Sequence, residues 1–192
     1  MNTYTGTTTV STGTLLVAAG GTLNTSSAIT VATGATLNNA NGASITPALT
    51  LQQGSTLVTS AASSAFTPAS LTLSGDLSTW NANPITLTNT AGIGLTKGGS
   101  LTLQLTGIAA GTYNLTSGSG FSGSFTTSAN VNGNALSASG SDWVGTNISG
   151  FNYTYTNSLN QLVVSAVPEP QTWALLAFSL TTVMILRRRR NS

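Results

Sequence analysis

Few side chains of this 192-residue sequence can carry acid–base or nucleophilic chemistry. It has no histidine and no cysteine, and its charged residues before position 167 are Asp76, Asp142 and Lys97. Two carboxylates can hydrolyse a glycosidic bond when they converge on one cleft. Both aspartates follow Gly/Ser pairs, however, where Asp commonly bonds the backbone of its own turn. We therefore expect a non-enzyme without metal or cofactor, with a remnant enzyme as the alternative, and a solvated Lys97 before Gly98 and Gly99.

Aromatic side chains offer a second kind of candidate site. Trp143, Tyr153 and Tyr155 stand among Ser, Thr and Asn residues near the end of the body. Aromatic faces stack on the apolar faces of sugars, and neighbouring hydroxyl and amide groups can bond sugar hydroxyls. These three residues are therefore a possible saccharide contact, for example with an exopolysaccharide. The alternative interpretation is that they pack in the core and in a terminal cap.

The distribution of charge excludes one class of partner. Lys97 against Asp76 and Asp142 gives residues 1–166 a formal charge of −1, and the remaining charges belong to the C-terminal segment. Binding to nucleic acid needs several Lys or Arg side chains at phosphates. We expect no nucleic-acid partner for the body. Its frequent, patterned Thr, Val, Ile and Leu residues favour an all-β fold over disorder.

A seven-residue unit recurs three times and predicts the corners between strands. Each copy reads apolar, two small or polar residues, Gly, any residue, Thr, Leu. The glycine permits a positive φ at a tight corner, and the leucine after the threonine points inward from the next strand. The copies are Val17–Leu23, Val31–Leu37 and Leu51–Leu57.

Short alternating segments supply the strands themselves. Their central threonines fall at 30, 50, 72, 86 and 102, each between two aliphatic residues, so one face of each strand is apolar and the other carries hydroxyl groups. The steps of 20 and 22 residues fit the turns of a right-handed parallel β-helix or solenoid, whereas the steps of 14 and 16 fit hairpins. We expect an all-β solenoid-like body, with a β-sandwich as the alternative.

Three regions follow from these patterns. Residues 1–110 carry the solenoid-like repeats, and residues 111–166 form an irregular β region that ends in a capping hairpin. The hairpin is predicted from the alternation of Phe151–Thr156 and the return strand Gln161–Ser165. Residues 117–150, rich in Gly, Ser and Asn, are expected to form long loops or irregular strands. Residues 167–192 form a separate C-terminal segment.

The C-terminal segment has three parts in order. Val167, Pro168, Glu169 and Pro170 form an extended motif, because proline lacks a backbone donor and fixes φ. An apolar run from Trp173 to Leu186 follows, about 21 Å long as a helix and short for a permanent span. Positively charged clusters stay on the cytoplasmic side, which places the body across the membrane. The cluster comprises Arg187, Arg188, Arg189 and Arg190.

This arrangement resembles the PEP-CTERM sorting signal of Gram-negative bacteria. The resemblance implies that exosortase, a membrane-embedded cysteine transpeptidase, reads the Pro-Glu-Pro motif and releases or transfers the body. It also implies a chain held in the inner membrane by a lipid-embedded helix before processing, and a cell-surface or secreted product afterwards, associated with the exopolysaccharide matrix of a biofilm. The alternative is an ordinary C-terminal membrane anchor.

The first residues carry a second resemblance. Asn2-Thr3-Tyr4-Thr5-Gly6, with the Thr, Val, Gly and Leu residues that follow up to Val17, resembles the autotransporter-associated β-strand repeat of secreted β-solenoid proteins. This segment has neither the basic nor the apolar region of a secretory signal. We expect that the chain starts in mid-repeat and that an upstream part carries the export signal. A short protein with an unusual export route is the alternative.

Overall fold

The fold is all-β over the described residues. In the computed structural model these are residues 3–23, 26–40, 43, 45–60, 67–89, 95–119, 121–168 and the single positions 178, 181 and 184. Strands account for almost all the regular structure, and α1 (Leu77–Trp80) is a single helical turn between two of them. The predicted C-terminal helix from Trp173 to Leu186 lies almost wholly outside the described residues.

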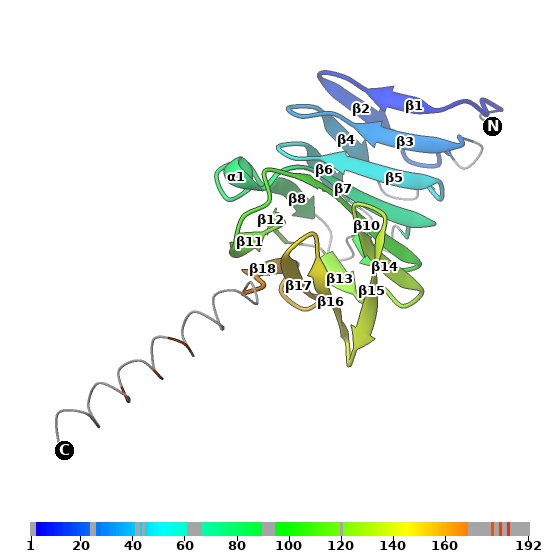
Figure 1. The fold of residues 1–192 in the computed structure, drawn as a ribbon. Helices are drawn as coiled ribbons and strands as arrows, with labels where there is room; N and C mark the ends of the chain where they lie inside the picture. The colour runs from blue at the N-terminus through cyan, green and yellow to red at the C-terminus, as the bar shows by residue number, and fades with distance from the viewer. Residues whose placement is uncertain are drawn as a thin grey trace, which may run out of the picture.

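The largest sheet begins with six parallel strands and continues with five antiparallel ones (Figure 1). The parallel strands, in spatial order, are β1 (Thr8–Val10), β3 (Ala28–Val31), β5 (Ala48–Gln52), β7 (Ser70–Asp76), β10 (Ser100–Thr106) and β14 (Ser128–Val131). The antiparallel strands are β15 (Asn134–Ser139), β16 (Asp142–Ile148), β17 (Phe151–Thr156), β18 (Gln161–Ala166) and β11 (Gly111–Asn114).

Two smaller sheets are parallel throughout. From β1 to β8, successive strands of the chain alternate between the largest sheet and the second one, so neighbouring strands in this part of each sheet are not consecutive in the sequence. The second sheet comprises β12 (Thr116–Gly118), β8 (Ile85–Asn89), β6 (Thr56–Thr59), β4 (Thr36–Asn39) and β2 (Thr14–Val17). The third sheet pairs β9 (Leu95–Lys97) with β13 (Phe121–Gly123).

Strand register explains the uneven spacing of the central threonines. Thr30 pairs with Thr50, Thr50 with Thr72, and Thr72 directly with Thr102 in the first sheet. Thr86 belongs to β8 of the second sheet, where it pairs with Thr56. The steps of 14 and 16 residues therefore mark a change of sheet and are not hairpins, which corrects that part of the sequence interpretation.

The predicted corners are confirmed. Gly20, Gly34 and Gly54 have φ values of 73°, 74° and 74°, in the left-handed region that glycine adopts without a steric penalty. In each unit the main-chain N–H of the residue before the Thr-Leu pair donates to the carbonyl oxygen three positions earlier and so closes the turn. The leucine that follows is buried at Leu37 and Leu57 and partly buried at Leu23. Gly34 N donates a hydrogen bond to Gly54 O at 3.1 Å, so successive corners are also bonded to one another.

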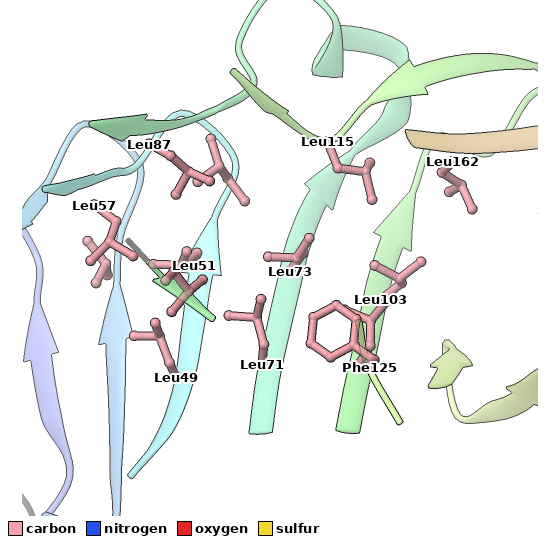
Figure 2. Packing of buried hydrophobic residues seen from close by; sticks show 14 of the residues in the cluster. Leu49, Leu51, Leu57, Leu71, Leu73, Leu87, Leu103, Leu115, Phe125 and Leu162 are labelled. Atoms are coloured by element: carbon pink, nitrogen blue, oxygen red, sulfur yellow. The ribbon is translucent and has the colours of Figure 1, made fainter. Parts of the chain in front are cut away.

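A column of aliphatic side chains forms the interior between the sheets. Leu49, Leu71 and Leu101 lie in register on neighbouring strands, and all three are buried. Figure 2 shows Leu57 and Leu87 of the second sheet pointing into the same interior as the leucines of β5 and β7. Burying a leucine side chain contributes roughly 1.5–3 kcal/mol, so this column is the main source of stability.

The C-terminal part contains more regular strands than the sequence suggested. The predicted hairpin is confirmed as β17 and β18, joined by the turn 157–160. Residues 117–150, expected to be long loops or irregular strands, contain β13 through β16 and the last residues of β12. Parallel pairing continues through β14, which pairs with β10. Strand pairing therefore changes from parallel to antiparallel at β14. This change lies inside the predicted irregular region 111–166 and not at its boundary.

Candidate functional site

Lys97 is buried at the end of β9, although the sequence predicted a solvated lysine. Its side chain is 5% exposed, because β9 directs alternate residues inward and Lys97 follows buried Leu95 by two positions. Burial lowers the pKa of Lys97 to about 8, and the negative charge of Asp142 opposes that change. An amine with this pKa is partly neutral near pH 8, which a surface lysine is not.

Asn157 is the main partner of this amine. Lys97 Nζ donates a hydrogen bond to the main-chain carbonyl oxygen of Asn157, the first residue of the turn between β17 and β18. Asn157 is 1% exposed. The amine also lies 4.8 Å from the ring centroid of Phe121, a distance at which a cation is attracted to the ring. The pair thus joins the third sheet to the terminal hairpin.

Three further hydrogen bonds hold Asn157 in place. Its side-chain Oδ1 accepts from the main-chain N–H of Phe125 at 3.2 Å, and its Nδ2 donates to the carbonyl oxygen of Ser141. Its own main-chain N–H donates to Asp142 Oδ1 at 3.0 Å. A buried amide costs free energy unless its groups are paired, and here both ends of the carboxamide are paired.

Aromatic rings surround these polar groups. Phe125 lies 6.1 Å from Tyr155 and 6.4 Å from Phe121, measured between ring centroids. We call Lys97, Phe121, Phe125, Asp142 and Asn157 the Lys97–Asn157 cluster. A depression of about 230 Å³ between Phe125 and Asp142 opens beside it to the surface. The cluster therefore combines a buried amine, a buried carboxamide and one carboxylate in apolar surroundings.

The three predicted saccharide contacts are core residues. Trp143, Tyr153 and Tyr155 are 7%, 1% and 0% exposed. Trp143 Nε1 donates to Phe125 O at 3.2 Å, and burial raises the pKa of Tyr155. The faces of these rings contact protein, so they offer no surface on which a sugar can stack. Their placement corrects the idea that they contact a saccharide and matches the alternative of core packing.

The two aspartates have separate surroundings. Asp76 caps α1: its Oδ1 accepts from the Ser78 hydroxyl at 2.7 Å and from the Ser78 N–H at 2.9 Å. These two bonds hold the pKa of Asp76 below its ordinary value. This is the local turn contact that the sequence indicated. Asp142 instead bonds Asn157 of the hairpin turn, and among the described residues the aspartates share no hydrogen-bond partner.

The structure describes only the start of the predicted sorting motif. Val167 N donates to Gly150 O at 2.9 Å, directly after β18, and Pro168 is exposed. Glu169, Pro170, Trp173, Leu186 and the four arginines lie outside the described residues. Within the described part of the chain, no helix is long and apolar enough to cross a membrane.

Sequence reasoning missed the Lys97–Asn157 cluster because its members are far apart in the chain. Lys97 and Asn157 are separated by 60 positions, and the third sheet that buries Lys97 has only two short strands. The available signal was alternation: Leu95-Thr-Lys97 places lysine on the same face as leucine.

Comparison with known protein families, with curated proteins and with solved structures found no match to this chain.

Proposed function

We propose that this protein is an exported, non-enzymatic component of the cell surface or extracellular matrix. In this proposal the body is a right-handed parallel β-helix capped by its terminal hairpin, and the C-terminal segment is a PEP-CTERM signal. Parallel, in-register pairing between strands from successive repeats supports a β-helix over a β-sandwich, whose sheets are antiparallel.

The observation that carries the proposal is a pair of threonine columns on the outer faces of the two large sheets. In each column the strand register aligns threonines of successive strands, about 4.8 Å apart. The first column is Thr9, Thr30, Thr50, Thr72 and Thr102, and the second is Thr14, Thr36, Thr56 and Thr86. All are exposed or half-buried.

Such columns suit a neutral, hydrated environment. Hydroxyl groups at a regular spacing can exchange hydrogen bonds with water or with polysaccharide hydroxyls, and they carry no charge that would attract polyions. The body supplies only three charged side chains, of which Lys97 is buried. A structural role among neutral sugars is consistent with this surface.

The position of the motif supports access by a membrane enzyme. The Val-Pro-Glu-Pro sequence starts at Val167, one residue after β18 ends, and Pro168 is exposed. Each proline of the motif lacks a backbone N–H and disfavours a helical residue before it, so the sequence of the motif disfavours a helix. In the proposed route, exosortase acts at Pro168–Pro170 while the apolar run holds the chain in the inner membrane.

Intact mass tests this route. The protein is recovered from envelope and medium of an exosortase-positive host and of its exosortase-deleted counterpart, with a Glu169→Gln variant as the matched control for motif recognition. The proposal expects a product ending near Pro168 to Pro170 only in the first host and only with Glu169 present. Persistence of the full C-terminal segment in both hosts would make residues 173–190 a plain membrane anchor.

A carbohydrate-binding module is the second candidate, and the exposed threonine columns are the observation in its favour. Because Trp143, Tyr153 and Tyr155 are buried, a saccharide would have to bind along one of the two threonine columns. Replacing Thr50 and Thr72 by Val keeps their shape and removes two hydroxyl groups from one sheet, whereas the same change at Thr56 and Thr86 alters the other sheet. Weaker retention on the host exopolysaccharide for one of the two double variants only would support this function. Equal retention of the wild-type protein and both double variants would reject it.

A further inference from the structure

We propose that Lys97 and Asn157 become joined by a covalent amide bond, which the folded protein forms from the lysine amine and the asparagine carboxamide. The inference does not depend on the proposed function. It starts from a juxtaposition: two buried residues, 60 positions apart, meet with the amine on the main-chain carbonyl oxygen of the asparagine. The surroundings exclude water, which would otherwise compete as a nucleophile.

The amine meets the first requirement of the reaction, which is an available lone pair. A protonated lysine cannot attack a carbonyl carbon. Burial removes the amine from water and so favours its neutral form, and it lowers the pKa of Lys97 to about 8. A substantial fraction of the amine is therefore neutral at mildly alkaline pH.

The carboxamide meets the second requirement, which is stabilisation of the charge that develops on its oxygen. Asn157 Oδ1 already accepts a hydrogen bond from the Phe125 N–H, at 3.2 Å in a buried environment. A fixed main-chain donor at this position stabilises a tetrahedral intermediate in the way that an oxyanion hole does. The remaining step is rotation of the carboxamide toward the amine, which gives up the bond from Nδ2 to Ser141 O.

Asp142 meets the third requirement, which is transfer of a proton. Its Oδ1 is 3.0 Å from the main-chain nitrogen of Asn157, and its charge acts on Lys97. In the proposed step the Nζ–Cγ bond forms, Asp142 takes a proton from the amine and passes it to Nδ2, and the Cγ–Nδ2 bond breaks. One ammonia molecule leaves through the depression beside Asp142. The step needs no oxidant, reductant or further reactant.

The bond would connect two parts of the fold that differ in strand arrangement. Lys97 belongs to the parallel third sheet, and Asn157 to the turn of the antiparallel hairpin β17–β18. The hairpin is also the element from which the C-terminal segment leaves the body. A covalent bond at this point would keep the hairpin attached to the parallel sheets when the C-terminal segment is pulled.

Mass spectrometry of the purified full chain tests the proposal. We expect an intact mass lower than the sequence mass by one ammonia molecule, and a protease digest in which the peptide containing Lys97 is joined to the peptide containing Asn157. The sequence mass together with two separate peptides would overturn the proposal.

Asparagine can also lose ammonia by closing on its own backbone to a succinimide, so a second treatment is needed. Hydroxylamine opens a succinimide and leaves an amide cross-link intact. Joined peptides that survive hydroxylamine support the proposal, whereas a loss of ammonia with separate peptides overturns it. A Lys97→Arg variant keeps a cation but not the nucleophile, and it should retain the full sequence mass.

Asp142→Asn tests the proton step. Asparagine keeps an Oδ1 acceptor for the Asn157 N–H but cannot carry the proton, and Asp142→Glu restores a carboxylate. We expect the full sequence mass for Asp142→Asn with an unchanged circular dichroism spectrum, and recovered joining for Asp142→Glu. Complete joining in Asp142→Asn would overturn the role of the carboxylate.

Discussion

Lys97 Nζ donates a hydrogen bond to the main-chain carbonyl oxygen of Asn157, across 60 positions of the chain. The contact connects two regions that differ in strand pairing. The parallel sheets pair strands from separate segments of the chain, whereas the terminal hairpin β17–β18 pairs two strands that are adjacent in sequence. A single buried lysine at their junction is costly unless it has a specific partner, and Asn157 supplies one.

The proposed cross-link predicts a large loss of stability in Asp142→Asn. Joining residues 97 and 157 closes a loop of about 60 residues in the unfolded chain, and the loop-entropy relation assigns about 4 kcal/mol to such a closure. The variant should therefore unfold at a lower denaturant concentration than the wild-type chain with an altered slope, because its unfolded state is less constrained. Guanidinium unfolding followed by tryptophan fluorescence measures both. Equal midpoints would contradict a cross-link in the wild-type chain.

The rate of cross-linking should rise with pH. Chain that is purified unfolded and unreacted is diluted into buffers from pH 6 to 10, and the mass is followed with time. The neutral fraction of Lys97 grows about tenfold per pH unit below its pKa of about 8 and then levels off, so the rate should follow the same curve. Asp142 is the charge that faces the amine, and Tyr155 stays neutral because burial raises its pKa. A rate independent of pH would show that the amine is not the nucleophile.

Local patterns in the sequence predicted the parts of the fold that repeat. Gly34 and Gly54 each stand three residues before a buried leucine, Leu37 and Leu57, and both adopt the predicted positive φ. The hairpin β17–β18 was equally clear, because alternation and a polar turn are both local signals. These elements need no information from distant residues.

Long-range features were not predictable in the same way. The sequence placed Thr86 in one series with Thr72 and Thr102, but the chain turns through α1 and enters the second sheet first. Nothing in a window of a few residues separates these alternatives. Lys97 was misjudged for the same reason: two glycines after it indicate a turn, whereas burial is decided by Phe121 and by the hairpin that packs there.

The corner glycines should be needed for their φ angle and not for space. Gly34 has φ +74° and no atom within 4 Å of where a Cβ would lie, so Gly34→Ala creates no clash. We expect it to lower the free energy of unfolding by roughly 1–2 kcal/mol, the strain of a left-handed alanine. Gly34→Asn is the matched control, because asparagine tolerates this region better, and should lose less. Urea unfolding measures both; equal losses would contradict the φ argument.

Ser55 occupies the position of the seven-residue unit that Ala35 occupies in the preceding unit, and both are 0% exposed. The hydroxyl Oγ of Ser55 has no hydrogen-bond partner in the described part of the chain. Its main-chain N–H donates to Gln52 O at 2.9 Å, a bond that an alanine would keep. Since an unpaired buried hydroxyl costs about 1–3 kcal/mol, Ser55→Ala should leave stability unchanged or raise it by up to that amount.

The reciprocal change supplies the control for Ser55→Ala. Ala35→Ser puts the same hydroxyl group into the equivalent position of the preceding corner, so it should destabilise the protein by a comparable amount. Thermal unfolding of both variants and of the double exchange checks the pair. If the corners are equivalent, the double exchange should return the melting temperature of the wild-type chain. A clear loss on Ser55→Ala would mean instead that this hydroxyl group is hydrogen-bonded in the folded protein, and that the two corners differ in more than sequence.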